Sequence, residues 1–374
     1  MTNHAGSNLA EQHTAAAPGR GALVAIVVAV LAVIVAGAAA IGWAARQDAT
    51  SGGSGESGGS AGSGSSGASD APTGEADGPD CTEATVDVTD ADELRAALDA
   101  ARPGDVIAMA PGRYDGRFTM TAAGKPDAPI TLCGSRDAIL DGGGTDDGYV
   151  VHLDGASHWV LQGFTVRNGQ KGVMADATTD TVIRDLDVSH IGDEAIHLRA
   201  GSTDNQVLHN TISDTGLRKP KFGEGIYIGT AESNWCDISD CEPDASDRNL
   251  IEGNAISNTT SESVDLKEGT SDGVLRDNTF DGAGMVEADS WVDVKGNGWL
   301  IEGNTGTTSP ADGFQTHEIL DGWGTGNVFR SNTADLGADG LGFSLKPERD
   351  NVVTCDNTVS GSGAELSNVE CRDE

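Results

Sequence analysis

Basic and aromatic residues are scarce in this chain of 374 residues. It contains 23 lysines and arginines against 59 aspartates and glutamates, and aromatic residues make up 4% of it. A net charge of −36 repels nucleic-acid phosphates, so we exclude nucleic acid as a partner. A hydrophobic fraction of 37% argues against a polytopic membrane protein. Residues 81–374 alone contain 21 basic and 52 acidic residues, so the acidity belongs to the folded part of the chain.

A single long apolar run occupies residues 21–45, between Arg20 and Arg46. Its 25 residues carry no charge, and at a rise of about 1.5 Å each they are long enough to span a bilayer. We predict an uncleaved transmembrane signal anchor at 21–45, preceded by a cytoplasmic tail at 1–20. The alternative is a cleaved signal peptide with a small-residue site at Ala38–Ala40, and the protein is then secreted.

Residues 46–80 are dominated by glycine and serine, a composition typical of a flexible linker. All the cysteines follow this linker, and an even number on one side of a membrane segment indicates disulfides in an extracellular, oxidising space. We therefore predict a single-pass cell-membrane protein whose domain at 81–374 is extracellular and monomeric. A local pairing scheme gives Cys81–Cys133, Cys236–Cys241 and Cys355–Cys371.

Two short phrases alternate from Trp159 onward. The first includes WVLQGFTV, TVIRDLDV and LIEGNAI, and its equivalent positions recur at steps of 22 to 28 residues, with one step of 44. The second includes GVMAD, AIHLR, GIYIG, SVDLK and WVDVK. Both alternate apolar with polar residues, the period of a strand, and glycine, asparagine and aspartate separate them. The pattern predicts a solenoid of parallel sheets. The long step predicts one coil with an insertion at about 217–248.

The repeat fits a right-handed parallel β-helix, an all-β solenoid. A capping-box-like start at Thr89–Asp92, followed by Leu94 and Leu98 on one face, predicts a short helix that covers the first coil. Strands are expected at 106–109, 130–133 and 138–142. The segment ELRAALDAARPGDVIAMAPGRY, with the later ITLCG and AILDGG, resembles the start of the pectate-lyase-like β-helix superfamily. The resemblance covers about 81–374 and is nearest to the alginate lyase and chondroitinase B family. The asparagine that recurs in the first phrase is interpreted as a structural ladder.

Equivalent residues of the second phrase form columns on one face of the solenoid, because coils stack about 4.8 Å apart. The first outward column is expected to be Met174, His197, Tyr227, Asp265, Asp293, Gln315 and Ser344. The second is expected to be Asp176, Arg199, Gly229, Lys267, Lys295, His317 and Lys346. We interpret five residues near this face as binding substrate, namely Arg199, His197, Tyr227, Trp291 and His317. The phrase around His317, GFQTHE, is similar to the active-site phrase of mannuronan C5-epimerases, with Gln315 in place of an aspartate.

Four carboxylates gather in the middle of this face, from Glu224, Glu262, Asp265 and Asp293. Carboxylates repeated at coil spacing repel one another unless they share a cation, and Ca²⁺ takes several oxygen ligands. We predict a Ca²⁺ site there. The spacing of Glu262 and Lys267 is similar to that of the alginate lyase and chondroitinase B family, in which a calcium-binding glutamate lies five residues before a lysine base. The resemblance implies Lys267 as the base, with Lys295 in the column position where the family has an arginine.

These features predict a membrane-tethered enzyme that cleaves an acidic polysaccharide by Ca²⁺-assisted β-elimination. Two other functions stay open: a non-catalytic carbohydrate-binding or adhesive rod, and a glycoside hydrolase that uses a carboxylate pair such as Glu262 and Asp293. Because Glu262 and Lys267 are expected on the outside of a coil, we predict that neutral replacements change the free energy of unfolding by no more than about 0.5 kcal/mol.

Overall fold

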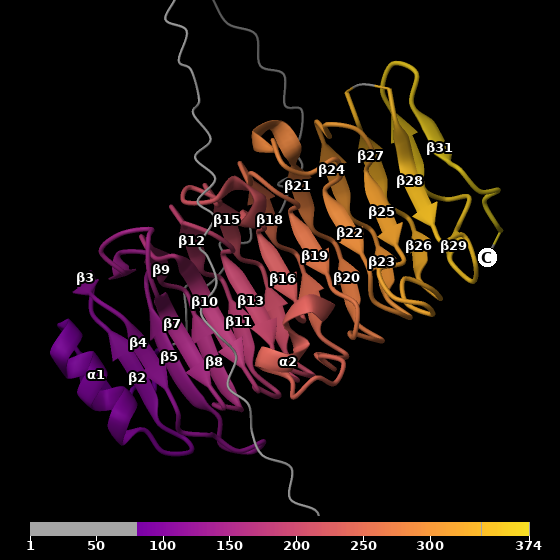
Figure 1. The fold of residues 1–374 in the computed structure, drawn as a ribbon. Helices are drawn as coiled ribbons and strands as arrows, with labels where there is room; N and C mark the ends of the chain where they lie inside the picture. The colour runs from indigo at the N-terminus through magenta and orange to yellow at the C-terminus, as the bar shows by residue number, and fades with distance from the viewer. Residues whose placement is uncertain (1–80, 338, 374) are drawn as a thin grey trace, which may run out of the picture. The chain divides into compact units, whose positions relative to one another are not determined.

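The computed structural model describes residues 81–337 and 339–373, so the predicted tail, anchor and linker at 1–80 lie outside the described residues. Within the described ranges, no helix combines the length and the apolarity needed to cross a bilayer. The described residues form stacked coils of a right-handed parallel β-helix, and every pairing between its strands is parallel (Figure 1). The predicted fold is confirmed.

Each full coil contributes one strand to each of three sheets, where the sequence indicated two phrases per coil. The reason is a corner inside the first phrase. The residue before the recurring position has a positive φ in successive coils, as Asp185, His209 and Asp277 show at 55°, 53° and 55°. One left-handed residue turns the chain sharply, so a phrase that reads as one strand divides into two.

The first sheet has the spatial order β1 (Val86–Val88), β2 (Val106–Met109), β5 (Ile130–Gly134), β8 (Trp159–Gln162), β11 (Val182–Arg184), β14 (Gln206–Leu208), β17 (Leu250–Glu252), β20 (Val274–Arg276), β23 (Leu300–Glu302), β26 (Val328–Arg330) and β29 (Val352–Val353). The second has the order β3 (Gly112–Asp115), β6 (Ala138–Asp141), β9 (Thr165–Arg167), β12 (Asp187–Ser189), β15 (Thr211–Ser213), β18 (Ala255–Ser257), β21 (Thr279–Asp281), β24 (Thr305–Thr307), β27 (Thr333–Asp335) and β30 (Thr358–Ser360).

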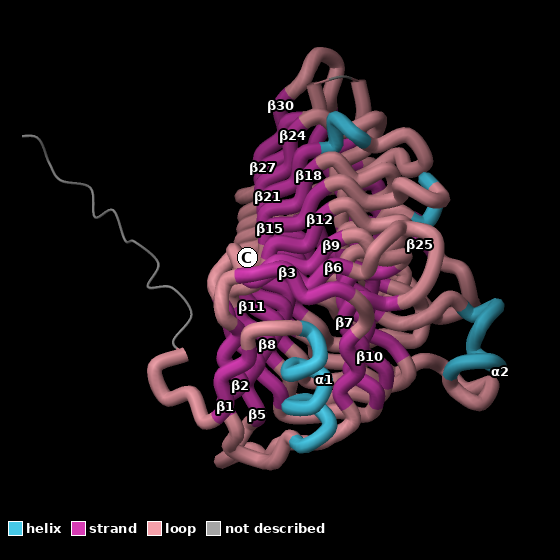
Figure 2. The backbone as a smooth tube through the Cα atoms, turned by 90° about the vertical axis from the view of Figure 1, so that its left-hand side faces the viewer, coloured by secondary structure: helices cyan, strands magenta, loops and turns pink. Residues whose placement is uncertain are grey.

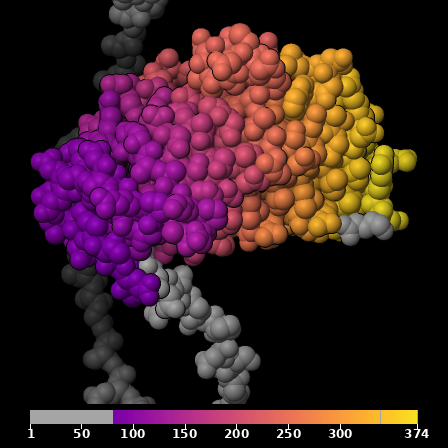
Figure 3. All heavy atoms as spheres, turned by 90° about the horizontal axis from the view of Figure 1, so that it is seen from below, coloured from indigo at the N-terminus to yellow at the C-terminus, as the bar shows by residue number. Residues whose placement is uncertain are grey.

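The third sheet has the order β4 (Phe118–Met120), β7 (Tyr149–Asp154), β10 (Lys171–Asp176), β13 (Ile196–Arg199), β16 (Ile226–Ile228), β19 (Val264–Leu266), β22 (Val292–Val294), β25 (Phe314–His317), β28 (Leu341–Lys346) and β31 (Glu365–Ser367). Successive coils follow one another as bands of colour along the domain, as the space-filling view shows (Figure 3). Sequence order therefore becomes position along the stack.

The N-terminal end of the stack is closed by helix α1 (Ala91–Ala100), as predicted. Asp90 is its N-cap and accepts hydrogen bonds from the backbone N–H groups of Asp92 and Glu93, while Glu93 reaches back to the N–H of Thr89. Leu94 and Leu98 are buried, and the helix contacts β1, β3 and β4, one strand of each sheet (Figure 2). A helix across the first coil covers an apolar end that stacking leaves open.

The recurring asparagine forms the predicted ladder. The Asn210 amide donates to Asn254 Oδ1 and the Asn254 amide to Asn278 Oδ1, each over 2.9 Å, and the series continues through Asn304 and Asn332. Each amide also bonds a backbone carbonyl, as Asn210 does with Ile183. These buried amides satisfy the backbone groups that the corners leave unpaired.

All three predicted disulfides are present, Cys81–Cys133, Cys236–Cys241 and Cys355–Cys371. The first ties the chain before β1 to β5 in the first sheet. The third closes the C-terminal end. The described residues contain no free cysteine.

The predicted insertion at about 217–248 consists of two arms, because β16 lies inside it. The η1 arm, residues 216–223, precedes β16 and contains the short helix η1 (Pro220–Phe222). The α2 arm, residues 230–246, follows β16 and contains η2 (Glu232–Asn234) and α2 (Trp235–Ile238). A further short helix, η3 (Gly282–Gly284), follows β21. The two arms therefore stand at opposite ends of one strand of the third sheet (Figure 1).

Candidate functional site

The outer face of the third sheet carries the predicted columns in the predicted register. The first column pairs in the order Met174, His197, Tyr227, Asp265, Asp293, Gln315 and Ser344. In the second column Asp176 pairs with Arg199 and His317 with Lys346. Period-two alternation and the coil spacing were sufficient to align these residues.

The face is much less exposed than the sequence indicated. Met174 is fully buried, Asp265 is 1% exposed, and the Lys267 side chain is 13% exposed. The η1 and α2 arms rise on either side, so the middle of the face is the floor of a cleft of about 770 Å³. The premise that Glu262 and Lys267 are ordinary surface sites is therefore wrong, because sequence periodicity does not show what covers a sheet.

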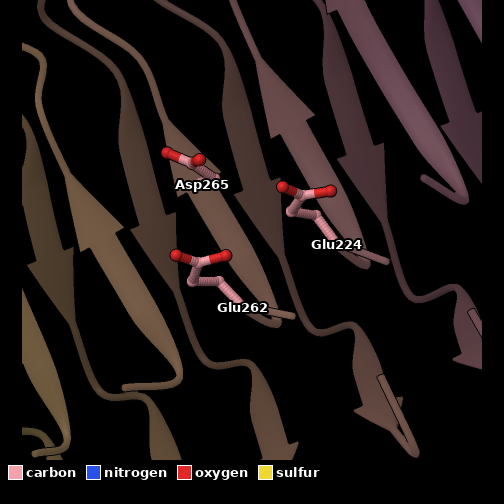
Figure 4. A group of neighbouring side chains, drawn as sticks. All are labelled: Glu224, Glu262 and Asp265. Atoms are coloured by element: carbon pink, nitrogen blue, oxygen red, sulfur yellow. The ribbon is translucent and has the colours of Figure 1, made fainter. Parts of the chain in front are cut away.

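Three of the four predicted metal-binding carboxylates meet on this floor. One oxygen each of Glu224, Glu262 and Asp265 lie within 4.8 Å of one another (Figure 4). Glu224 and Glu262 occupy the turns before β16 and β19, and a backbone hydrogen bond from Gly225 to Glu262 holds the two turns in register. Asp265 lies on β19. The turns align because the strands that they precede are stacked.

Glu224 has the least compensated charge of the three. Its Oε2 atom is buried and has no hydrogen-bond partner within the described residues. Burial, followed by the nearby Glu194, Asp265 and Glu262, raises the pKa of Glu224 well above its ordinary value. Burial and Asp265 also raise the pKa of Glu262. Because the raised pKa values mean that these carboxyl groups resist ionisation, a bound cation would stabilise their charged forms.

Asp265 is instead paired with both predicted catalytic lysines. Its oxygens lie 2.6 Å from Lys267 Nζ and 2.8 Å from Lys295 Nζ, and Lys295 also contacts Asp293 over 2.6 Å. Burial opposes charge on all of these groups, but the pairing outweighs it. The pKa of Asp265 is lowered, and the pKa values of Lys267 and Lys295 are raised. Both lysines are ammonium ions at neutral pH.

Tyr227 and His197 lie beside the lysines in the cleft. The Tyr227 ring is 5.0 Å from Lys267 Nζ, and its centroid is 4.4 Å from that of His197. Burial, with Asp265 and Glu224, raises the pKa of Tyr227 well above its ordinary value, so its hydroxyl keeps its proton. Burial, with Lys171 and Arg199, lowers the pKa of His197, and its Nε2 lies 2.9 Å from the Gly229 carbonyl oxygen.

Arg199 lines the same cleft toward the N-terminal coils. Its Nε donates to Asp176 Oδ1 over 2.6 Å, and Asp176 Oδ2 lies 2.8 Å from His152 Nε2. We name these three residues the Asp176 cluster. Burial works against ionisation of Asp176, but its two partners outweigh it and lower its pKa to about 2. This carboxylate is fully neutralised within the protein.

Three predicted site residues lie elsewhere. Trp291 is fully buried, and its Nε1 donates to the Thr307 carbonyl, so its predicted contact with substrate is wrong. Asp293 lies outside the three-carboxylate group and pairs with Lys295. His317 lines a separate open hollow with Lys346 and bonds Gln315 Oε1 over 2.7 Å. Trp291 precedes β22, so it lies outside the alternation that orders Asp293, and its ring packs in the core against Phe314.

Sequence reasoning missed several residues that line the cleft. Lys171, at the start of β10, forms an ion pair with Glu194 and approaches His197. The η1 arm adds Lys221 and Phe222. The only sequence signal for Lys221 and Phe222 was the long step between repeats, which located an insertion without showing which of its side chains return to the sheet.

The comparisons with known proteins agree with this fold. A family profile described as "Right handed beta helix region" matches residues 149–292. The solved structure of an alginate lyase from Paenibacillus sp. str. FPU-7 is 31% identical, with a TM-score of 0.68. The alignment covers 75% of this chain and 98% of that chain. The chain belongs to the pectate-lyase-like superfamily of right-handed parallel β-helix proteins.

More distant structures share the fold alone. Pectate lyase Pel9A is 17% identical with a TM-score of 0.53, over 74% of this chain and 72% of that chain. A rhamnogalacturonan lyase is 15% identical with a TM-score of 0.55, over 73% and 78%. A search of curated protein sequences gave no match. Because this fold hosts several chemistries, the residues of the cleft and not the fold indicate the reaction.

Proposed function

We propose that this protein cleaves a uronate polysaccharide by β-elimination in the cleft of the third sheet, with alginate as the first substrate to test. The observation that carries the proposal is the floor of the cleft, where two lysines, a protonated tyrosine and three carboxylates converge. The similarity to an alginate lyase at 31% identity supports the choice of polymer. Cationic side chains that line the cleft, among them Lys171, Lys221 and Lys267, give a polyanion a local place to bind in an otherwise acidic domain.

β-Elimination needs a base for the proton α to the uronate carboxyl group, a stabiliser of the resulting negative charge, and an acid for the leaving oxygen. Lys267, once it has released its own proton and is a neutral amine, accepts the C5 proton. The electron pair forms a C4–C5 double bond as the C4–O bond breaks, and the Tyr227 hydroxyl protonates the leaving oxygen. Lys295 stabilises the negative charge on the uronate carboxyl group. The Tyr227 hydroxyl makes no hydrogen bond to any described residue, and its raised pKa suits an acid.

The pairing with Asp265 opposes the role of Lys267, because a base must first lose its proton. The buried, unpartnered Oε2 of Glu224 supports a hard cation held by the carboxylate group of Glu224, Glu262 and Asp265. A Ca²⁺ held by these three residues would supply positive charge that neutralises Asp265 and polarises the uronate carboxyl group. Arg199 and His197 orient the neighbouring sugar.

The test is the ultraviolet absorbance of the unsaturated uronate, followed on alginate and then pectate and glycosaminoglycans, with Ca²⁺ and with chelator. Release of unsaturated ends by the full chain, lost in Lys267→Met, supports the proposal. Reducing ends released without unsaturation would assign a hydrolase. Polymer binding without any turnover would assign a carbohydrate-binding surface protein.

We further propose that residues 21–45 anchor the protein in the cell membrane with the β-helix outside, or direct its secretion if they are removed. The disulfides of the described domain suit that extracellular location. Fractionation of cells that express the full chain, with protease added outside, tests it. A domain protected from protease in intact cells overturns the placement.

A further inference from the structure

The η1 arm is held rigidly at the edge of the cleft. Gly216 and Gly223 approach so closely at its neck that a Cβ on Gly223 would lie 2.7 Å from the Gly216 Cα. The Thr260 hydroxyl, from the next coil, donates to the Pro220 carbonyl over 2.7 Å. Arg218 pairs with Asp193 of the preceding coil. The arm is thereby fastened to both neighbouring coils.

The tip of this arm exposes an aromatic ring. Phe222 is 36% exposed and lines the cleft, and its ring makes no contact with another aromatic ring among the described residues. It is one of few large apolar side chains on the surface of the described domain, together with Leu217, Val286 and Ile319. A ring that packing does not need presents a flat apolar surface to whatever enters the cleft.

Two ammonium groups flank this ring. Lys221 Nζ is 4.6 Å and Lys219 Nζ 5.5 Å from the Phe222 centroid. Neither lysine forms an ion pair with any described residue. Most lysine and arginine side chains of this acidic domain do form ion pairs, as Arg199, Arg248 and Arg276 show. The two ammonium groups lie over the Phe222 ring without a carboxylate partner among the described residues, so their charge is open to an anionic ligand.

The chemistry of the tip defines its ligand. A sugar ring stacks on an aromatic face, and two cations beside that face select a sugar that carries a carboxylate. A nucleic acid would also stack and pair, but the similarity to an alginate lyase favours a uronate polymer. We propose that Phe222, Lys219 and Lys221 form a second subsite, which binds an acidic sugar of the polymer other than the one cleaved at Lys267. This inference rests on the proposed function and adds to it a determinant of substrate length.

The experiment compares the full chain with Phe222→Ala and with Lys219→Gln/Lys221→Gln on mannuronate oligomers of increasing length. Both variants should raise KM about 3- to 10-fold for long oligomers, with kcat and the KM for the shortest substrate unchanged. Phe222→Trp should keep the wild-type KM, since it keeps a ring. The double lysine variant should also lose salt dependence of KM. Ile319→Ala and Lys125→Gln are the matched controls, because each removes an exposed group of the same kind outside the cleft.

A binding measurement separates this inference from the proposed function. Calorimetry with a long oligomannuronate in the Lys267→Met background should show the same loss of affinity for the arm variants. If the wild type cleaves the polymer and the arm variants behave like the controls, the subsite is overturned while the function stands. If no polymer is cleaved but binding still depends on Phe222 and the two lysines, the subsite stands and the lyase fails. A KM change equal for short and long oligomers also overturns the subsite.

Discussion

The Asp176 cluster and the carboxylate group of Glu224, Glu262 and Asp265 lie on the same face of the same sheet, yet their charges are balanced differently. Asp176 has two cationic or hydrogen-bonding partners, and its pKa falls to about 2. Glu224 has an unpartnered buried oxygen, and its pKa rises. A carboxylate neutralised by its neighbours stabilises the fold, whereas one left without a partner is available to a ligand. Position in a column alone does not distinguish the two.

The largest expected effect is on turnover, and it should come from the lysine that pairs with the carboxylate group. Lys267→Met removes the proposed base and should lower kcat by about 10²- to 10⁴-fold, the usual contribution of general base catalysis, with polymer binding retained. Arg276→Met is the control, because Arg276 pairs with Glu252 on the first sheet, away from the cleft. Initial rates of unsaturated-uronate formation measure both. A Lys267→Met protein with wild-type kcat would contradict the role of Lys267.

Calcium should stabilise the domain through the carboxylate group and not through the Asp176 cluster. At about 100 times its Kd, a ligand that binds only the folded protein adds about 2.7 kcal/mol, which thermal unfolding detects as a higher Tm. Glu224→Gln should reduce this shift, while Asp176→Asn should leave it intact. Magnesium is the control cation, since it demands a tighter octahedral site. An equal calcium shift in Glu224→Gln would show that the ion binds elsewhere.

Removing the charge of Asp176 should destabilise the fold by about 2 kcal/mol, the scale of hydrogen bonds to charged groups. The pKa of Asp176 is depressed from about 3.9 in unfolded chains to about 2. Its contribution is therefore present above pH ~4 and lost as the pH falls toward about 2. Denaturant unfolding of Asp176→Asn at neutral and acid pH measures the difference. A variant as stable as the wild type at pH 7 would overturn the structural role of the cluster.

Glu224→Gln should have the smallest effect and the opposite sign, a gain of about 1 kcal/mol at neutral pH without calcium, because it relieves repulsion among neighbouring carboxylates. The pKa of Glu224 is raised in the folded state, so its penalty on the fold begins above the unfolded value of about 4.3 and is complete above the raised pKa. The gain should disappear at about pH 4, where the glutamate is protonated in both states. Tm measured against pH with chelator present tests this. A loss of stability at neutral pH would mean that Glu224 is paired in solution.

Much of the fold was predictable because its causes are local and repeated. The strands at 106–109 and 130–133, the cap formed by Leu94 and Leu98, and the asparagine ladder all follow from short patterns. The corner inside each first phrase could not be predicted, since a single positive-φ residue such as Asp185 has no unique sequence signature. Trp291 was misplaced because it lies just before β22, outside the alternation that orders Asp293.

The sequence by itself determined the parallel β-helix and the order of residues along each outward column, because repeat spacing converts directly into stacking. Only the tertiary structure decided how these residues are used. It divided the insertion into two arms beside Asp265 and Lys267, and it paired Lys267 and Lys295 with Asp265. It also left Glu224 without a partner and placed Phe222 at the edge of the cleft. Burial and charge pairing depend on distances between segments far apart in the chain, and a repeat pattern does not contain those distances.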